Sequence, residues 1–155
     1  MRRPLLSLLV AASLSLPAGA ETASPVKVAE LSARLYAIGV ETGDPLLVIS
    51  AARLRKTLAP VASDRAPEGA TALVGAPLTW EEMLATAEAF AADDAALGGL
   101  ISDVRAETTK GVASGPVYNI GSLSNGGGDT YPPIEFIGGE YAEVYVEAKA
   151  ATNLN

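Results

Sequence analysis

The sequence predicts an α+β protein in which two N-terminal helical hairpins precede a small, incomplete antiparallel β segment. Four stretches between residues 25 and 110 repeat apolar side chains at steps of three and four, the spacing of one helix face. After Gly111 the composition shifts to Gly, Asn, Ser, Tyr and Val, and residues 140–148 alternate apolar with polar side chains. We therefore expect a helical region at residues 21–110 and a Gly-rich linker with the β segment at residues 111–155.

Residues 1–20 have the order of a secretory signal peptide. Arg2 and Arg3 precede an apolar run at residues 5–16, and the small residues before Glu21 are typical of a cleavage site. The run is shorter than the ~20 residues that a membrane-spanning helix needs, which favours cleavage near Ala20 over a membrane anchor. We expect the mature protein to be periplasmic or secreted, with no membrane span.

The first predicted hairpin joins a helix at residues 25–38 to a second helix that begins at Pro45 and stops before Pro60. A polar cap followed by proline opens each of them. Gly39 and Gly43 can each end the first helix. The apolar stripes expected to face the core are Val28, Leu31, Leu35 and Ile38 in the first helix, and Leu47, Ala51, Leu54 and Leu58 in the second.

The second predicted hairpin follows a connector at residues 59–78 that is rich in Ala, Pro and Gly. Thr79 starts a capping-box pattern, so a third helix should begin at Trp80. Asp94 caps a fourth helix, which should end near Lys110. The expected core stripes are Met83, Leu84, Ala87 and Phe90 in the third helix, and Leu97, Leu100, Ile101 and Val104 in the fourth.

Three short strands are expected after the helices, at residues 117–120, 134–137 and 140–148. Gly138-Gly139 has the length and composition of a two-residue hairpin turn between the last two. The last strand should have one buried face and one solvent-exposed face. Its apolar face consists of Ala142, Val144, Val146 and Ala148, and its solvent face of Tyr141, Glu143, Tyr145 and Glu147.

The runs Asp-Thr-Tyr at 129–131, Ile-Glu-Phe at 134–136 and Gly-Gly-Glu at 138–140, with the strand after them, resemble the opening strands of bacterial pre-peptidase C-terminal domains. The chain also resembles uncharacterised secreted proteobacterial proteins that place such a segment after an alanine-rich helical region. The resemblance implies the first part of a β-sandwich, with residues 152–155 standing where an Asp-rich strand would begin. It further implies a sugar-binding, calcium-binding or protease-accessory role.

The composition excludes several chemistries. The 155 residues contain neither Cys nor His, which rules out disulfides, thiolate or imidazole zinc sites and Ser-His-Asp triads. A metal would need oxygen ligands, and no motif for one is present, so we expect no metal and no cofactor. The formal net charge of −7 disfavours nucleic acid as a partner.

The candidate contact residues for a ligand or partner are Tyr131, Tyr141, Glu143, Tyr145 and Glu147. Carboxylates flanked by aromatic side chains are typical of glycosidases. We nevertheless expect no catalysis and no enzyme, because glutamates on the wet face of a strand keep ordinary pKa values.

A basic cluster, Arg53, Arg55 and Lys56, lies at the end of the second helix, where cations interact favourably with the helix dipole. That account needs no anionic ligand. The sequence thus favours a non-catalytic envelope interaction module that binds through the helical hairpins or the sheet edge. Its partner is another envelope protein, or a second copy bound at the edge of the last strand. The alternative is a carbohydrate- or calcium-binding accessory module that uses the β segment.

Overall fold

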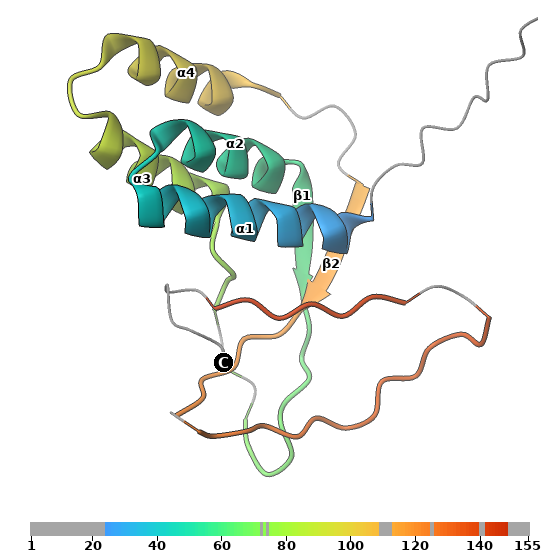
Figure 1. The fold of residues 1–155 in the computed structure, drawn as a ribbon. Coiled ribbons are helices and arrows are strands. Elements are labelled where there is room, and N and C mark those ends of the chain that lie inside the picture. The colour runs from blue at the N-terminus through green and yellow to red at the C-terminus, as the bar shows by residue number, and fades with distance from the viewer. Residues whose placement is uncertain are drawn as a thin grey trace, which may run out of the picture.

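The computed structural model describes residues 24–71, 73, 75–108, 113–124, 126–139 and 142–148. The predicted signal peptide at residues 1–20 and the candidate residue Tyr141 lie outside this part of the chain. The described elements are α1 (Pro25–Thr42), α2 (Pro45–Lys56), β1 (Leu58–Ala62), α3 (Trp80–Ala91), α4 (Ala95–Ala106) and β2 (Ala113–Tyr118) (Figure 1). The predicted α+β class is confirmed.

The helices form one layer, and a second layer of extended chain lies below them (Figure 1). Helix α2 is central, since it packs against α1, α3 and α4. The two strands run from the helices toward the second layer, which we call the loop layer and define as the described residues within 63–79 and 119–148. The main hydrophobic core therefore lies within the helical layer. Its buried members are Val48, Ile49, Ala51, Ala52, Met83, Leu84, Ala87, Ala91, Ile101 and Val104.

Helix α1 faces the other helices with only part of the predicted stripe: Leu35 packs against the core, but the buried residues of α1 are small. Ala29, Ser32 and Gly39 are buried, whereas Leu31 and Ile38 are 50% and 48% exposed. The cause is a close approach of α1 and α2: a Cβ on Gly39 would lie 2.7 Å from a methyl carbon of Val48. Backbones this close leave room only for small side chains at the contact itself, so Leu31 and Ile38 are exposed while Leu35 packs beside it.

Several predicted boundaries and stripes also need correction. Helix α1 continues through Gly39 and ends at Gly43, whose φ of 65° is the left-handed C-cap conformation. Leu58 belongs to β1, not to a helix stripe. Phe90 and Leu100 are 36% and 45% exposed, so only part of each later stripe faces the core. The predicted capping box at Thr79 is present, and α3 begins where expected.

The sheet is a two-stranded parallel pair, β1 with β2, and not the predicted antiparallel segment. Its register runs from Leu58 opposite Ala113 to Ala62 opposite Tyr118, with an irregularity near Pro60. A Cβ on Gly115 would lie 2.0 Å from the carbonyl oxygen of Ala59, so the pairing requires glycine there.

The predicted strands at residues 134–137 and 140–148 do not form in the described chain. A turn is present at Gly138-Gly139, and Gly139 has a φ of 86°. The chain on either side of it diverges, so no hairpin results (Figure 1). The strand expected at residues 117–120 overlaps the end of β2.

Candidate functional site

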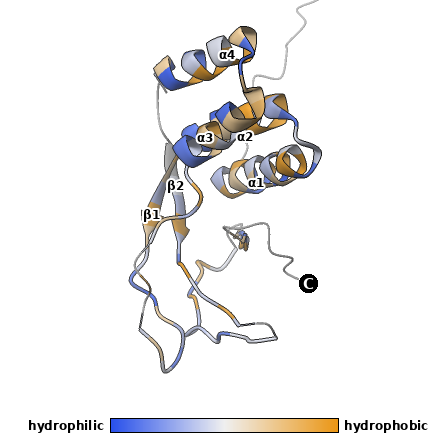
Figure 2. Cartoon of the chain, turned by 90° about the vertical axis from the view of Figure 1, so that its left-hand side faces the viewer, coloured by the Kyte–Doolittle hydropathy of each residue, from blue (hydrophilic) through white to orange (hydrophobic). Residues whose placement is uncertain are grey.

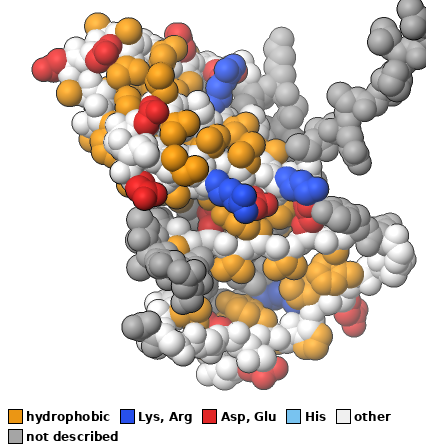
Figure 3. All heavy atoms as spheres, viewed as in Figure 1, with side chains coloured by type: hydrophobic (Ala, Val, Ile, Leu, Met, Phe, Trp, Pro, Cys, Tyr) orange, Lys and Arg blue, Asp and Glu red, His pale blue; other side chains and the backbone are white. Residues whose placement is uncertain are grey.

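The extended segment, residues 142–148, runs alongside α1 with its predicted faces reversed (Figure 1). Glu143, Tyr145 and Glu147 are partly buried, while Val144 and Val146 are 74% and 72% exposed. The prediction that the two glutamates face solvent was therefore wrong. Charged side chains of the helical layer account for the reversal. Figure 3 shows basic and acidic side chains side by side where α1 meets the loop layer.

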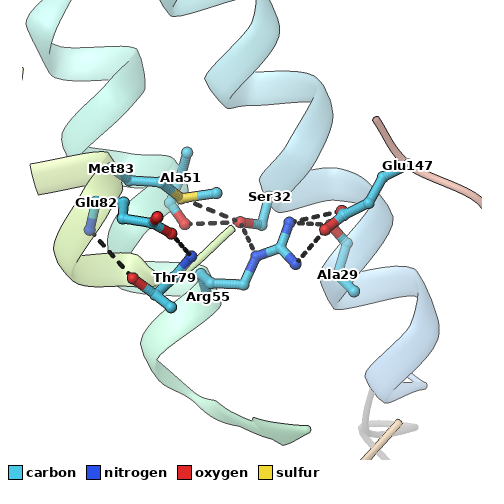
Figure 4. Close-up of polar contacts among 8 residues, drawn as sticks. All are labelled: Ala29, Ser32, Ala51, Arg55, Thr79, Glu82, Met83 and Glu147. Carbon is cyan, nitrogen blue, oxygen red and sulfur yellow. Dashed lines mark hydrogen bonds and ion pairs between the residues drawn. The ribbon is translucent and has the colours of Figure 1, made fainter. Parts of the chain in front are cut away.

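Arg55, in the last turn of α2, is the centre of these contacts (Figure 4). Its side chain is only 7% exposed, and its Nη1 and Nη2 donate to the two carboxylate oxygens of Glu147 at 3.0 and 2.8 Å. Its Nε donates to Ser32 Oγ at 3.2 Å, and its Nη2 also donates to the Ala29 carbonyl oxygen at 3.4 Å. We call this group, Arg55 with Glu147, Ser32 and Ala29, the carboxylate latch.

Ser32 holds the helical side of the latch in place. It is fully buried and donates to the carbonyl oxygen of Ala51 at 2.9 Å, so the same hydroxyl can accept from Arg55. Two residues of α1 thus position the guanidinium, and the carboxylate comes from the other layer. A bidentate arginine–carboxylate pair of this kind is among the stronger polar contacts in proteins.

Glu143 makes a second contact at the start of α1. It accepts a hydrogen bond from Ser24 Oγ and pairs with Lys27 Nζ at 3.5 Å. Ser24 is also the N-cap of α1, since its side chain accepts from the Val26 amide. The Lys27 side chain is 61% exposed, so solvent screens this pair much more than the pair at Arg55.

Tyr145 lies between these two contacts in sequence. Burial raises the pKa of its hydroxyl, and the nearby negative charge of Glu147 adds to the effect while the positive charge of Arg55 opposes it. Tyr131 belongs to another part of the loop layer, and within the described residues no hydrogen bond or ion pair joins it to the latch. The structure thus brings together three of the five candidate residues.

The basic cluster does more than complement the helix dipole. Arg53 donates two hydrogen bonds of 2.8 Å to Glu107, just after α4. Lys56 Nζ donates to the carbonyl oxygens of Val104 and Arg105 at the end of α4, and it lies 4.5 Å from the ring centroid of Trp80. The three bases therefore tie α2 to different neighbours. Their spacing in the sequence identifies the cluster, but nothing in it identifies Glu147 as the partner of Arg55.

No group of three or more acidic side chains suited to a metal ion occurs in the described ranges. Of the helices in the described chain, none has the length and apolar character to cross a bilayer. Comparisons with protein-family models, with curated proteins and with solved structures find no match to the chain.

Proposed function

We propose that the protein is an exported, non-catalytic interaction module and that its partner, a second copy of the chain, binds along residues 142–148. The supporting observation is the exposure of the valine row, Val144 and Val146, at 74% and 72%. The latch holds the polar side of the segment against the helices, so its apolar side is presented to solvent. Exposed apolar rows on an ordered surface are typical of interaction sites.

The backbone of the segment is also available for pairing. Val144, Tyr145 and Val146 make no hydrogen bond to other chain segments in the described part of the structure. An extended segment with open N–H and C=O groups can pair with another strand, with backbone hydrogen bonds supplying affinity and side chains supplying selectivity. This supports strand addition at the segment.

The sequence of the segment favours a second copy as the added strand. Residues 142–148 read Ala-Glu-Val-Tyr-Val-Glu-Ala, which is the same in both directions. Two copies paired antiparallel about Tyr145 would form a two-fold symmetric contact, in which residue i lies opposite residue j and j opposite i. Because the segment reads the same in both directions, each residue would also face one of its own type, and the valines of the two copies would lie together. Glu143 would lie opposite the second copy's Glu147, but both carboxylates already contact basic side chains, which reduces their repulsion.

Sugar or calcium binding, the other function expected from the sequence, has less support. The carboxylates of Glu143 and Glu147 both contact basic side chains, which compete with a cation for their oxygens. Tyr131 is not linked to Tyr145 by the contacts that hold the extended segment. The resemblance to pre-peptidase C-terminal domains stays a prediction.

Sedimentation equilibrium of the mature chain tests self-association. We expect a concentration-dependent dimer for the wild type and a monomer for V144E/V146E, because a charged row cannot form an apolar contact. The matched control is V117E, which changes an equally exposed valine (71%) on β2 and should still dimerise. A wild type that stays monomeric at all concentrations, or a V117E variant that dissociates like the double variant, would contradict the proposal.

A further inference from the structure

We infer that α1 and Arg55 form a binding site for an extended acidic peptide, and that residues 142–148 occupy this site as a tethered ligand. The site lies under the segment, on the side opposite the valine row. The inference therefore does not rest on self-association.

The positive half of the site belongs to the helices alone. Ser32 Oγ and the Ala29 carbonyl, both of α1, accept hydrogen bonds from Nε and Nη2 of Arg55, and with residues 142–148 in place the Arg55 side chain is only 7% exposed. A buried guanidinium without a carboxylate is an uncompensated charge, which is strongly unfavourable. A segment that covers Arg55 must therefore bring an anionic group to this position, whichever chain supplies it.

The bound segment defines the chemistry of the ligand. Its two carboxylates are four residues apart, and in an extended chain residues at this spacing lie on one face roughly 13 Å apart. Glu147 contacts Arg55, and Glu143 contacts Lys27 and Ser24 nearer the start of α1. Tyr145, between them, is partly buried on the same face. The preferred ligand is thus an extended peptide of the pattern Glu-x-Tyr-x-Glu.

The ligand is attached to the site by a connector with little structure of its own. In the described part of residues 119–139 there is no helix or strand. The Glu68 amide donates to the Thr130 carbonyl at 2.7 Å, and Arg65 Nη1 donates to the Pro132 and Pro133 carbonyls at 3.4 Å, and these bonds link the connector to the rest of the loop layer. A short covalent connector gives the tethered segment an effective concentration of roughly millimolar or more. A peptide on another chain can compete once the tethered copy is weakened or cut.

Peptide binding to the full mature chain tests the inference. The probes are fluorescein-labelled Ala-Glu-Val-Tyr-Val-Glu-Ala and the matched amide peptide Ala-Gln-Val-Tyr-Val-Gln-Ala, which keeps the apolar and aromatic side chains. We expect the acidic peptide to bind the E143Q/E147Q variant at least about 10-fold more tightly than it binds the wild type, because the variant loses its tethered competitor. Adding R55Q should abolish this gain, whereas R53Q, which changes a neighbouring exposed arginine, should not. Equal binding of both peptides, or a gain that survives R55Q, would overturn the inference.

A nicked chain keeps the test valid if the double variant does not fold. A protease site replacing the exposed glycines Gly126 to Gly128 allows the connector to be cut while the latch residues stay intact. We expect the C-terminal fragment to remain bound after cleavage and to be released by excess acidic peptide but not by the amide peptide. Three outcomes would count against a peptide-binding site. The fragment could dissociate as soon as the connector is cut, neither peptide could release it, or both peptides could release it equally.

Discussion

The helical layer and the loop layer place their apolar side chains in opposite ways. In the helical layer, the largest fully buried side chains include Met83, Leu84 and Ile101, as expected for a hydrophobic core. In the loop layer, Ile137, Val144 and Val146 are more than 70% exposed, while the glutamates beside the valines are partly buried. Figure 2 shows hydrophobic residues both between the helices and along the extended chain below them. Hydrophobicity therefore orders one layer, and charge orders the other.

The magnitudes explain why charge decides the orientation of the extended segment. Burying each valine would contribute roughly 1.5–3 kcal/mol. Leaving Arg55 buried without its carboxylate would cost about 3–5 kcal/mol, and the contacts of Glu143 would be lost as well. Turning the segment over would thus gain roughly 3–6 kcal/mol from the two valines and lose about as much, so burial of the valines does not outweigh the ion pairs. The valines then stay outside unless a partner covers them.

The largest expected effect tests the core of the helical layer. Leu84→Ala should lower the free energy of unfolding by about 2–5 kcal/mol, because Leu84 is fully buried and the change leaves a cavity. Leu31→Ala is the matched control on α1. Leu31 is half exposed, so its loss should cost about 0.5 kcal/mol or less. Urea denaturation measures both, and equal costs would mean that α1 packs through the stripe that its sequence predicts.

The second-largest expected effect on stability comes from breaking the Arg55–Glu147 pair of the carboxylate latch. Glu147→Gln leaves the guanidinium of Arg55 without a carboxylate and should destabilise the protein by about 3 kcal/mol. Glu143→Gln should cost at most about 1 kcal/mol, because its partner Lys27 is largely exposed. Hydrogen exchange at residues 142–148 should accelerate strongly in the first variant only. Similar stability and exchange in both would show that Arg55 does not hold the layers together.

A smaller effect tests the contact between α1 and α2. Gly39→Ala should cost about 1–3 kcal/mol, because the new methyl group would overlap Val48. Gly98→Ala, in α4, places the same methyl group in open space and should stabilise the protein by about 0.5–1 kcal/mol. Thermal melting of the two variants should therefore shift in opposite directions. A stabilising Gly39→Ala change would show that the helices are farther apart than described.

The smallest effect concerns acid pH. Hydrogen bonds from Arg105 and Arg53 lower the pKa of Glu88 and Glu107, respectively, below the ordinary value of 4.5. A lowered pKa in the folded state adds stability above the pKa of the unfolded chain, and this stability is lost as the pH falls through the folded value. We expect the wild type to lose a little stability below about pH 4.5. The E88Q/E107Q variant, which lacks these two carboxylates, should show a smaller loss over the same pH range. Because both pairs are exposed, 1 M salt should reduce the difference, and a salt-independent difference would contradict this assignment.

The sequence predicted a region well where the pattern reflects local contacts, and poorly where the structure depends on contacts between distant segments. Helix starts at Ser24, Asp44, Thr79 and Asp94 were predictable because capping is local. The buried face of α1 was predicted only in part, at Leu35, because the fit of Gly39 against Val48 is a contact between helices. The parallel pairing of β1 with β2 joins distant segments and could not be predicted from alternation alone.

The candidate site was predicted in part. Alternation correctly placed Glu143, Tyr145 and Glu147 on one face of an extended segment, but it could not say which face is buried. That choice depends on Arg55, which is 92 positions away in the sequence. The same alternation also predicted strands in residues 134–148, where the chain is extended but makes no strand pair in the described part.

The placement of Lys56 over Trp80 has a consequence for spectroscopy. Trp80 is the single tryptophan of the chain, and it lies at the start of α3, where the ammonium group also contacts the end of α4. Indole fluorescence therefore reports on the docking of α2, α3 and α4, while detachment of residues 142–148 leaves that environment unchanged. Comparing the emission of this chromophore with amide exchange along the C-terminal segment separates partial opening from global unfolding, since noncoincident transitions reveal an intermediate.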